Sequence, residues 1–564
     1  MASSQTAPKT PPKTSRKTPQ TVVEAAPKTV AFVTLGCAKN EVDSDKMRAR
    51  LSAAGFALLP GAGAAGAAGA AAGTAAVDAA GPADADVVIV NTCSFITEAT
   101  EEAISTIFSL LSLPRLAQGR AHLIVAGCMP ARYGSALAQE LPEVAAFVTC
   151  EDEDKIVDIV NAVLGHNKSE QDASHNPKTS STNGDKNATQ SPTELALSVS
   201  RTVSAPWAYV KIADGCNRFC SFCTIPHIRG RYRSVPVGAI VAEIEGLVAG
   251  GVQEIVLIAQ DTGIWGGDIA AAPDLVPITP FVDADEPTTL AGLLELLATR
   301  FPDTWLRVMY LQPQGLTDEL LAVMARHSNI CNYLDIPLQH ASARVLAEMN
   351  RKGSGAEYLA LLARIRAALP DVALRTTVIA GFPGETRAEA RELERFIEEA
   401  AFDYVGVFMY SQEEGTVAGR RTDQVPMRTR RARAQRLRDL ADAAGFAKVA
   451  ERVGESIEVL VTEYDEDAGD AGLPSAAAAG AVGAAAGAVE SADSAGAVGA
   501  EGAAEGAADG AAVATSYPLL GRTKWQAPEV DGTIHLNRGR IGEKLSATIV
   551  ETYCYELDGI VTEP

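Results

Sequence analysis

The sequence has no apolar run approaching the roughly 20 residues that a membrane-spanning helix needs. Its first residues are mostly Lys, Pro, Ser and Thr, without the apolar core of a secretory signal peptide. Basic residues are outnumbered, and the formal net charge of −22 disfavours strong nonspecific binding to nucleic acid. We therefore predict a cytoplasmic protein with no membrane partner. Its nine cysteines then indicate thiol or metal chemistry, because the cytosol keeps thiols reduced.

Segments of low complexity separate three regions that are able to pack a core, at residues 28–165, 202–448 and 449–564. The separating segments lack the bulky, periodic side chains that offset the entropy cost of ordering a chain. We interpret them as a disordered tail (1–27), a flexible linker (166–201), insertions at about 60–83 and 465–514, and a loop at about 268–286.

The first region contains short apolar runs that each lead into a cysteine: TVAFVTLGC to Cys37, DVVIVNTC to Cys93 and HLIVAGC to Cys128. Continuous β-branched runs that alternate with helical stretches are typical of buried parallel strands, so we predict an open α/β sheet. Ligands gather at the carboxyl ends of such strands, where the three thiols could converge. The alternative is that they are buried core thiols, which are common for cysteine.

The second region repeats the strand-then-helix rhythm and predicts a partial parallel (β/α) barrel, whose active site would lie at the carboxyl ends of the strands. The candidate strands are residues 208–215, 254–261, 306–313, 333–338, 374–381 and 404–411. The stretch DGCNRFCSFC follows the first strand and carries Cys216, Cys220 and Cys223. The third region alternates with period two around Gly-containing turns, which predicts a small antiparallel β-barrel.

The C-x3-C-x2-C spacing supplies three thiols, whereas a structural zinc site needs four ligands and disulfides need an even count. Iron–sulfur clusters commonly take four thiolates, so three would leave one iron of a 4Fe–4S cube open to the amino and carboxylate groups of a small molecule. The zinc alternative requires a fourth ligand, for which His227 is near in sequence.

Several motifs together resemble the methylthiotransferases of the radical S-adenosylmethionine superfamily: NTCSFI, GCMPARYG, DGCNRFCSFCTIPHIRGRYRS, YLDIPLQHAS and GFPGET. The resemblance covers nearly all of the chain outside the tail and insertions. It implies an amino-terminal domain with three cysteines, a radical SAM barrel and a carboxyl-terminal TRAM β-barrel.

The resemblance also implies two 4Fe–4S clusters. Cys216, Cys220 and Cys223 would hold the one that cleaves S-adenosylmethionine to a 5′-deoxyadenosyl radical, and Cys37, Cys93 and Cys128 the one that delivers sulfur. Two molecules of S-adenosylmethionine are expected per product, one as methyl donor and one as radical source. The remaining cysteines, Cys150, Cys331 and Cys554, match no ligand position and are interpreted as packing residues.

Other residues of the barrel are candidates for contact with S-adenosylmethionine or substrate. Gly381, Gly384 and Glu385 in GFPGE fall where such barrels contact the cofactor, and the less favoured alternative is a tight turn. Gln260, at the end of the second strand, is a comparable candidate. Arg229 and Arg231 suit an acidic substrate or a solvated loop.

Two branches of the family differ in substrate: one modifies an aspartate β-carbon of small-subunit ribosomal protein S-twelve, the other a tRNA purine (isopentenyl- or threonylcarbamoyl-adenosine). Outside its insertion the third region has eleven acidic and six basic residues, which suits a basic ribosomal protein better than tRNA. The motif GRTKWQAPEVDG (521–532) also resembles the ribosomal-protein branch. The Arg-dense stretch 426–440 is either an RNA contact or a solvated helix, and we favour the helix.

We therefore predict methylthiolation of S-twelve, free or in the ribosomal subunit, with tRNA as the less favoured substrate. The expected partners are a low-potential flavodoxin or ferredoxin reductant and a sulfur donor. An alternative of another class is a non-catalytic iron–sulfur electron carrier, which would need neither a barrel nor an open iron.

Overall fold

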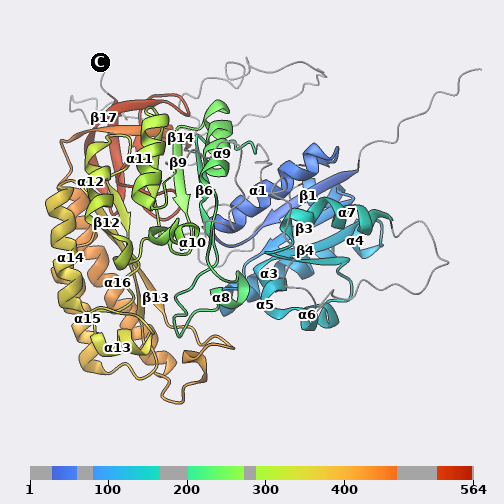
Figure 1. Ribbon diagram of the computed structural model, residues 1–564, viewed down its shortest axis with the longest axis horizontal. Coiled ribbons are helices and arrows are strands. Elements are labelled where there is room, and N and C mark those ends of the chain that lie inside the picture. The colour runs from blue at the N-terminus through green and yellow to red at the C-terminus, as the bar shows by residue number, and fades with distance from the viewer. Residues whose placement is uncertain (1–27, 60–79, 166–200, 272–286, 466–516, 562–564) are drawn as a thin grey trace, which may run out of the picture.

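The computed structural model describes residues 28–59, 80–165, 201–271, 287–465 and 517–561 (Figure 1). The tail, most of the linker, the core of the first insertion, most of the loop near residue 280 and the acidic insertion lie outside these ranges. No helix within the described ranges has the length and apolar character that crossing a bilayer requires.

The first unit is a five-stranded sheet in the order β2-β1-β3-β4-β5, with every pair of neighbours parallel. Its strands are β1 (Thr29–Thr34), β2 (Ala57–Leu58), β3 (Val87–Thr92), β4 (His122–Gly127) and β5 (Ala146–Thr149). Helices α1 (Ala38–Ala53) and α7 (Ile156–Gly165) cover one face and α3 (Thr97–Leu111) the other, because alternate strand residues belong to two separate apolar clusters. The short helices of this unit are α2 (Ala80–Asp84), α4 (Pro114–Ala117), α5 (Cys128–Tyr133) and α6 (Ser135–Glu140).

The second unit confirms the partial barrel, and all six predicted strands are present. Two parallel three-stranded sheets, in the orders β10-β9-β6 and β11-β12-β13, are linked by a bridge between Leu306 and Ile330. The strands are β6 (Trp207–Lys211), β9 (Glu254–Ile258), β10 (Trp305–Val308), β11 (Tyr333–Asp335), β12 (Ala373–Ala380) and β13 (Tyr404–Met409). The longer helices are α9 (Val237–Ala249), α11 (Leu290–Arg300), α12 (Asp318–Arg326), α14 (Gly355–Ala368), α15 (Arg387–Ala400) and α16 (Met427–Ala450). The shorter elements are β7 (Ala213–Asp214), β8 (Arg233–Ser234), α8 (Ile225–Ile228), α10 (Gly267–Ala271) and α13 (Ala343–Glu348).

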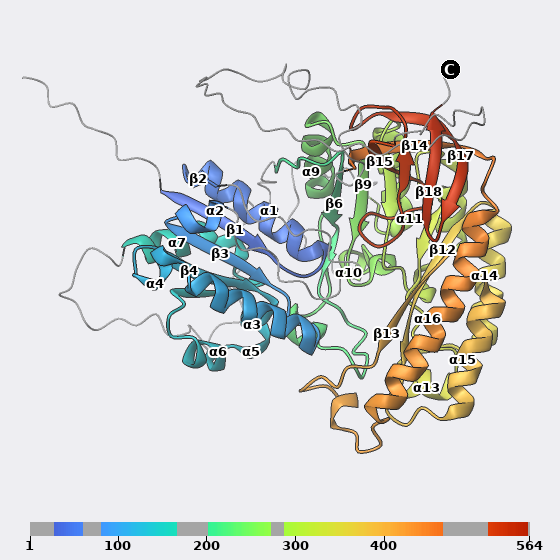
Figure 2. The same ribbon diagram turned by 180° about the vertical axis from the view of Figure 1, so that it is seen from behind.

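The third unit is a closed five-stranded barrel in the order β14-β15-β16-β18-β17 (Figure 2). Its strands are β14 (Ser456–Tyr464), β15 (Leu519–Thr523), β16 (Ile534–Leu536), β17 (Lys544–Tyr553) and β18 (Glu556–Val561). The predicted antiparallel pairing is right for every pair except β16 and β18, which run parallel. The segment after β15 packs under the larger barrel, where the Tyr333 hydroxyl donates to Asp531 at 2.7 Å.

Three predicted boundaries need correction. Arg201, assigned to the flexible linker, is 3% exposed, and its Nε donates to Glu243 at 2.9 Å. Asp268, assigned to a flexible loop, is the second residue of α10, and its carboxylate accepts a hydrogen bond from the Ser234 hydroxyl at 2.6 Å. The first insertion ends before about residue 83, because α2 already begins at Ala80.

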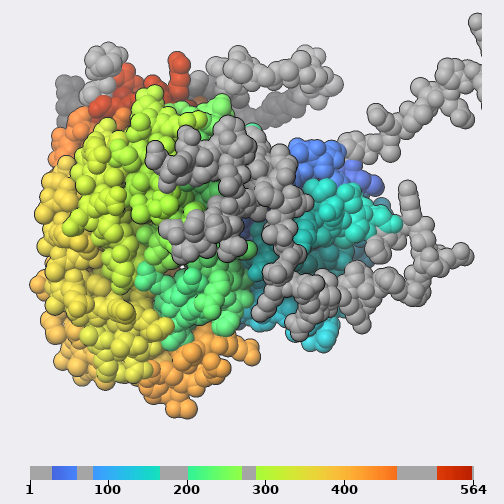
Figure 3. Space-filling model, viewed as in Figure 1, coloured from blue at the N-terminus to red at the C-terminus, as the bar shows by residue number. Residues whose placement is uncertain are grey.

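The first unit lies against the second (Figure 3). Residues of α1 pack into the interior of the partial barrel. Ala38 and Val42 of α1 share one apolar cluster with Val256 of β9 and Tyr333 of β11. This contact brings the carboxyl edge of the first sheet next to the strand ends of the barrel.

Candidate active site

Four cysteines follow the carboxyl ends of four parallel strands of the first sheet: Cys37, Cys93, Cys128 and Cys150. The Cys37 and Cys128 thiols lie 3.5 and 4.0 Å from the same atom, Asn40 Oδ1. Gly36 has a φ of +101°, and a Cβ there would lie 2.4 Å from the Cβ of Cys93, so glycine lets the two chains approach. The structure thus brings together the three cysteines whose convergence the strand pattern predicts.

The thiols of this group have unlike environments. Burial raises the pKa of the Cys93 thiol to about 12. A hydrogen bond with Cys150, together with the Arg229 guanidinium, lowers the pKa of Cys128 below its usual range despite burial. Cys150 was predicted to be a packing residue, and its position beside Cys128 was not expected.

Cys216, Cys220 and Cys223 occupy the loop between β7 and α8, beyond the first strand of the barrel. The Cys216 amide donates to the Gly230 carbonyl at 3.2 Å, and Arg351 Nη1 lies 3.8 Å from the Cys220 thiol. Phe219, between them, adopts a left-handed φ of 49°, which turns the chain sharply within the motif. Burial raises the pKa of Cys223 to about 12.

The donor chemistry of both groups fits an iron–sulfur cluster. In such a cluster each thiolate binds a different iron, so the sulfurs stand apart around it and do not converge on one ion. Within the described ranges, no three His, Cys, Asp or Glu side chains are arranged to hold a single metal ion. His227, the fourth ligand that a zinc site would require, is exposed on α8.

The candidate residues for S-adenosylmethionine fall into two kinds. Both polar side-chain atoms of Gln260, just beyond β9, are buried without a hydrogen-bond partner in the protein, which leaves them available to a ligand. Gly381 and Gly384 have φ angles of +78° and +76°, and Glu385 Oε2 accepts from the Gly381 amide at 2.6 Å. These three residues therefore build a tight turn, and their contact with the cofactor stays a prediction.

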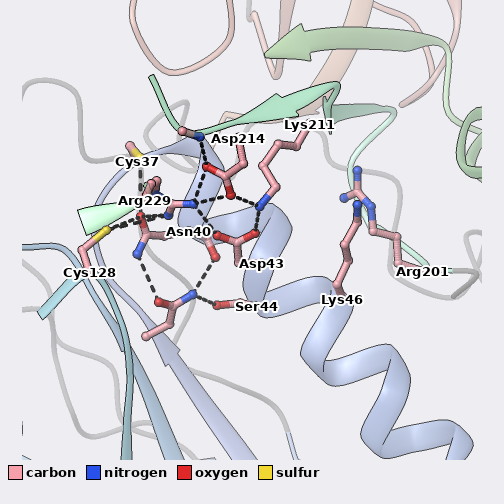
Figure 4. A network of polar contacts seen from close by, with 12 residues as sticks. Cys37, Asn40, Asp43, Ser44, Lys46, Cys128, Arg201, Lys211, Asp214 and Arg229 are labelled. Carbon is pink, nitrogen blue, oxygen red and sulfur yellow. Dashed lines mark hydrogen bonds and ion pairs between the residues drawn. The ribbon is translucent and has the colours of Figure 1, made fainter. Parts of the chain in front are cut away.

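Arg229 lies between Cys128 and Asp214, which precedes the second cysteine group in sequence, and it is neither a solvated loop residue nor free for substrate. Its side chain is 1% exposed, and Nη1 lies 3.0 Å from Asp43 of α1 and 3.2 Å from Asp214 of β7. Nη2 lies 3.7 Å from the Cys128 thiol (Figure 4). Lys211 also pairs with both Asp43 and Asp214. Two cations and two carboxylates therefore form one ion-pair network between the units.

Replacing Arg229 with Met should lower the free energy of unfolding by about 3 kcal/mol, because it removes a cation from the buried Asp43 carboxylate and from the partly buried Asp214 carboxylate. Urea denaturation followed by tryptophan fluorescence would measure the change. Arg48→Met is the matched control: its pair with Asp45, at 2.9 Å, is partly exposed, so about 1 kcal/mol or less is expected. Equal losses for the two variants would contradict a structural role for the Arg229 network.

Two further predictions can be compared with the structure. The Arg-dense stretch forms the first half of α16, where Arg430 is buried and Arg433 Nη1 pairs with Glu385 at 2.8 Å, which favours the packing interpretation. Cys331 is buried as predicted, whereas Cys554 is exposed in the turn between β17 and β18, so its assignment as a packing residue is wrong.

Two family models match the chain. The radical SAM superfamily matches residues 210–397, and the model described as uncharacterized protein family UPF0004 matches residues 67–149. The first match includes Cys216, Cys220 and Cys223, and the second includes Cys93 and Cys128 but begins after Cys37.

Curated relatives match over most of their length. The ribosomal protein uS12 methylthiotransferase RimO of Geobacter sulfurreducens is 34% identical over 94% of this chain and 98% of its own. The protein of the same name from Opitutus terrae is 40% identical over 77% of this chain and 87% of its own. Among solved structures, the radical S-adenosylmethionine methyltransferase TsrM from Kitasatospora setae has a TM-score of 0.46 and 14% identity, covering 70% of this chain and 74% of that one.

Proposed function

Because this chain belongs to the family of the ribosomal protein uS12 methylthiotransferases, we propose that it transfers a methylthio group to the β-carbon of an aspartate of uS12. As a member of that family it is a radical SAM methylthiotransferase. The observation that carries the proposal is the junction of two units that each carry three cysteines beyond their strand ends, where Arg229 contacts Cys128 of one unit and Asp214 of the other.

In this proposal Cys216, Cys220 and Cys223 hold a 4Fe–4S cluster, and Cys37, Cys93 and Cys128 hold a second one. When bound, the two groups would supply reductive cleavage of S-adenosylmethionine and delivery of sulfur, respectively. The chain's own residues fix the geometry: Arg351 contacts Cys220, Asn40 contacts Cys37 and Cys128, and Gln260 offers two free polar atoms to the cofactor. Two molecules of S-adenosylmethionine, a low-potential reductant and a sulfur donor complete the reaction, in the cytoplasm where ribosomes lie.

A tRNA substrate is the second candidate, and the contacts of α16 speak against it. Arg430 and Arg433 are engaged within the protein, which leaves them poorly placed for phosphates, whereas Arg436 is exposed beside Glu394. The excess of acidic over basic residues in the third unit is weaker evidence against tRNA than the sequence alone indicates. Two of the counted acids, Glu529 and Asp531, bond Tyr209 and Tyr333 of the larger barrel and do not face a partner.

The experiment is anaerobic reconstitution with iron and sulfide, followed by reductant, S-adenosylmethionine, and both uS12 and unmodified tRNA in one reaction. We expect mass spectrometry to find the methylthio group on a uS12 aspartate. A methylthio group on the tRNA purine would overturn the proposed substrate but not the chemistry. Iron binding without turnover of S-adenosylmethionine would favour an electron carrier.

A further inference from the structure

Lys39 is a buried cation at the junction of the two cysteine groups. It lies in the first turn of α1, two residues after Cys37, and is 8% exposed. Its Nζ stands 3.9 Å from the ring centroid of Tyr310, just beyond β10 of the barrel. Within the described ranges its ammonium group makes no hydrogen bond or ion pair, although most of the side chain is withdrawn from solvent.

The acidic groups near Lys39 are engaged elsewhere. Asp335, at the end of β11, accepts from Arg375 Nη1 and from the Tyr310 amide, each at 3.3 Å. Asp214 is bonded by Lys211 at 2.9 Å and by Arg229 at 3.2 Å. The ring of Tyr310 supplies the remaining contact, and a ring face attracts a cation more weakly than a carboxylate does. An anion that arrived at Lys39 would therefore meet a largely desolvated ammonium group that has no carboxylate partner.

The position of Lys39 is also the position that a substrate side chain must reach. It is adjacent to Cys37 of the sulfur-donating group and faces the strand ends of the barrel, beyond which Cys216, Cys220 and Cys223 lie. We propose that Lys39 binds the carboxylate of the substrate aspartate and so selects an acidic side chain for modification. This inference rests on the proposed function and names the residue that recognises its substrate.

The charge of the ligand follows from the contact. An ammonium–carboxylate hydrogen bond in a buried site is stronger than one to a neutral amide, and an amide would leave the cation uncompensated. Asparagine at the target position should consequently bind about tenfold to a hundredfold more weakly than aspartate. A purine ring offers this lysine only neutral ring-nitrogen acceptors, which bind an ammonium group more weakly than a carboxylate does.

A double-mutant cycle tests the proposal with the reconstituted full-length chain. Wild type and Lys39→Met are each titrated with uS12 and with uS12 carrying Asn at the target aspartate, and the dissociation constants are compared by biolayer interferometry. We expect wild type to prefer aspartate by at least about tenfold and Lys39→Met to lose most of that preference. Lys39→Arg keeps the charge and should keep part of the preference.

Lys155→Met is the matched control, since Lys155 is 59% exposed and pairs with Asp152 on the surface of the same unit. It should discriminate as wild type does. Iron content and the urea midpoint of every variant show whether the fold is intact, and Lys39→Gln replaces Lys39→Met if that variant does not fold. If Lys39→Met binds both targets more weakly by one factor, or discriminates as well as wild type, the role of Lys39 is overturned. If wild type binds uS12 but does not distinguish Asp from Asn, carboxylate recognition itself is overturned.

Failure of wild type to modify uS12 would instead overturn the proposed function, and the inference with it.

Discussion

Replacing Cys220 with Ala should reduce the release of 5′-deoxyadenosine from S-adenosylmethionine to the level seen without enzyme. The middle cysteine of C-x3-C-x2-C is the one whose thiol lies 3.8 Å from Arg351 Nη1. With only Cys216 and Cys223 remaining, two thiolates would have to hold a cluster that already leaves one iron to the small molecule. Both the iron bound at this site and the cleavage activity should therefore be lost together.

Cys554→Ala is the matched control for that variant. This thiol is exposed in the turn between β17 and β18, remote in sequence from either cysteine group. Its removal should leave iron content and 5′-deoxyadenosine release unchanged. Chromatography of the nucleoside product and an iron assay on the same samples provide the comparison. If Cys220→Ala released as much 5′-deoxyadenosine as wild type, the assignment of the radical-generating site would be contradicted.

The strands were predictable because each one is a short apolar run with a clear local boundary. The six barrel strands and the cysteine-bearing strands β1, β3 and β4 read directly from such runs. β15, Leu519–Thr523, is harder to predict because its only bulky apolar residues are Leu519 and Leu520. The parallel pairing of β16 with β18 depends on how the barrel closes, which no local pattern specifies.

The cysteine sites were predictable for a related reason: parallel strands end at one edge, so residues that follow them gather there. What the sequence does not reveal is how two units meet. Arg229 bonds Asp43, and Lys39 stacks on Tyr310, only because α1 packs into the open side of the barrel. Neither residue has a local signal, since a lone Arg or Lys in a sequence is usually a solvated surface residue. Glu385 shows the converse, because a residue of a recognisable motif uses its carboxylate to close its own turn.

Replacing Cys93 with Ala should separate the two halves of the reaction. Cys93 is 8% exposed at the end of β3, beside Gly36, and belongs to the other cysteine group. Because Cys216, Cys220 and Cys223 remain in place, S-adenosylmethionine should still be cleaved to 5′-deoxyadenosine. The methylthio group on uS12 should disappear, because the sulfur-donating group keeps only two of its three proposed ligands.

Cys150→Ala sharpens the test of the second group, since this thiol also follows a strand of the same sheet and contacts Cys128. If Cys37, Cys93 and Cys128 are the ligands, Cys150→Ala should retain bound iron and most of its methylthio transfer, while Cys93→Ala loses both at this site. Intact protein mass spectrometry of uS12 and iron counting on each variant decide between them. Retained sulfur transfer in Cys93→Ala together with its loss in Cys150→Ala would move the third ligand from β3 to β5, and would leave the radical-generating site untouched.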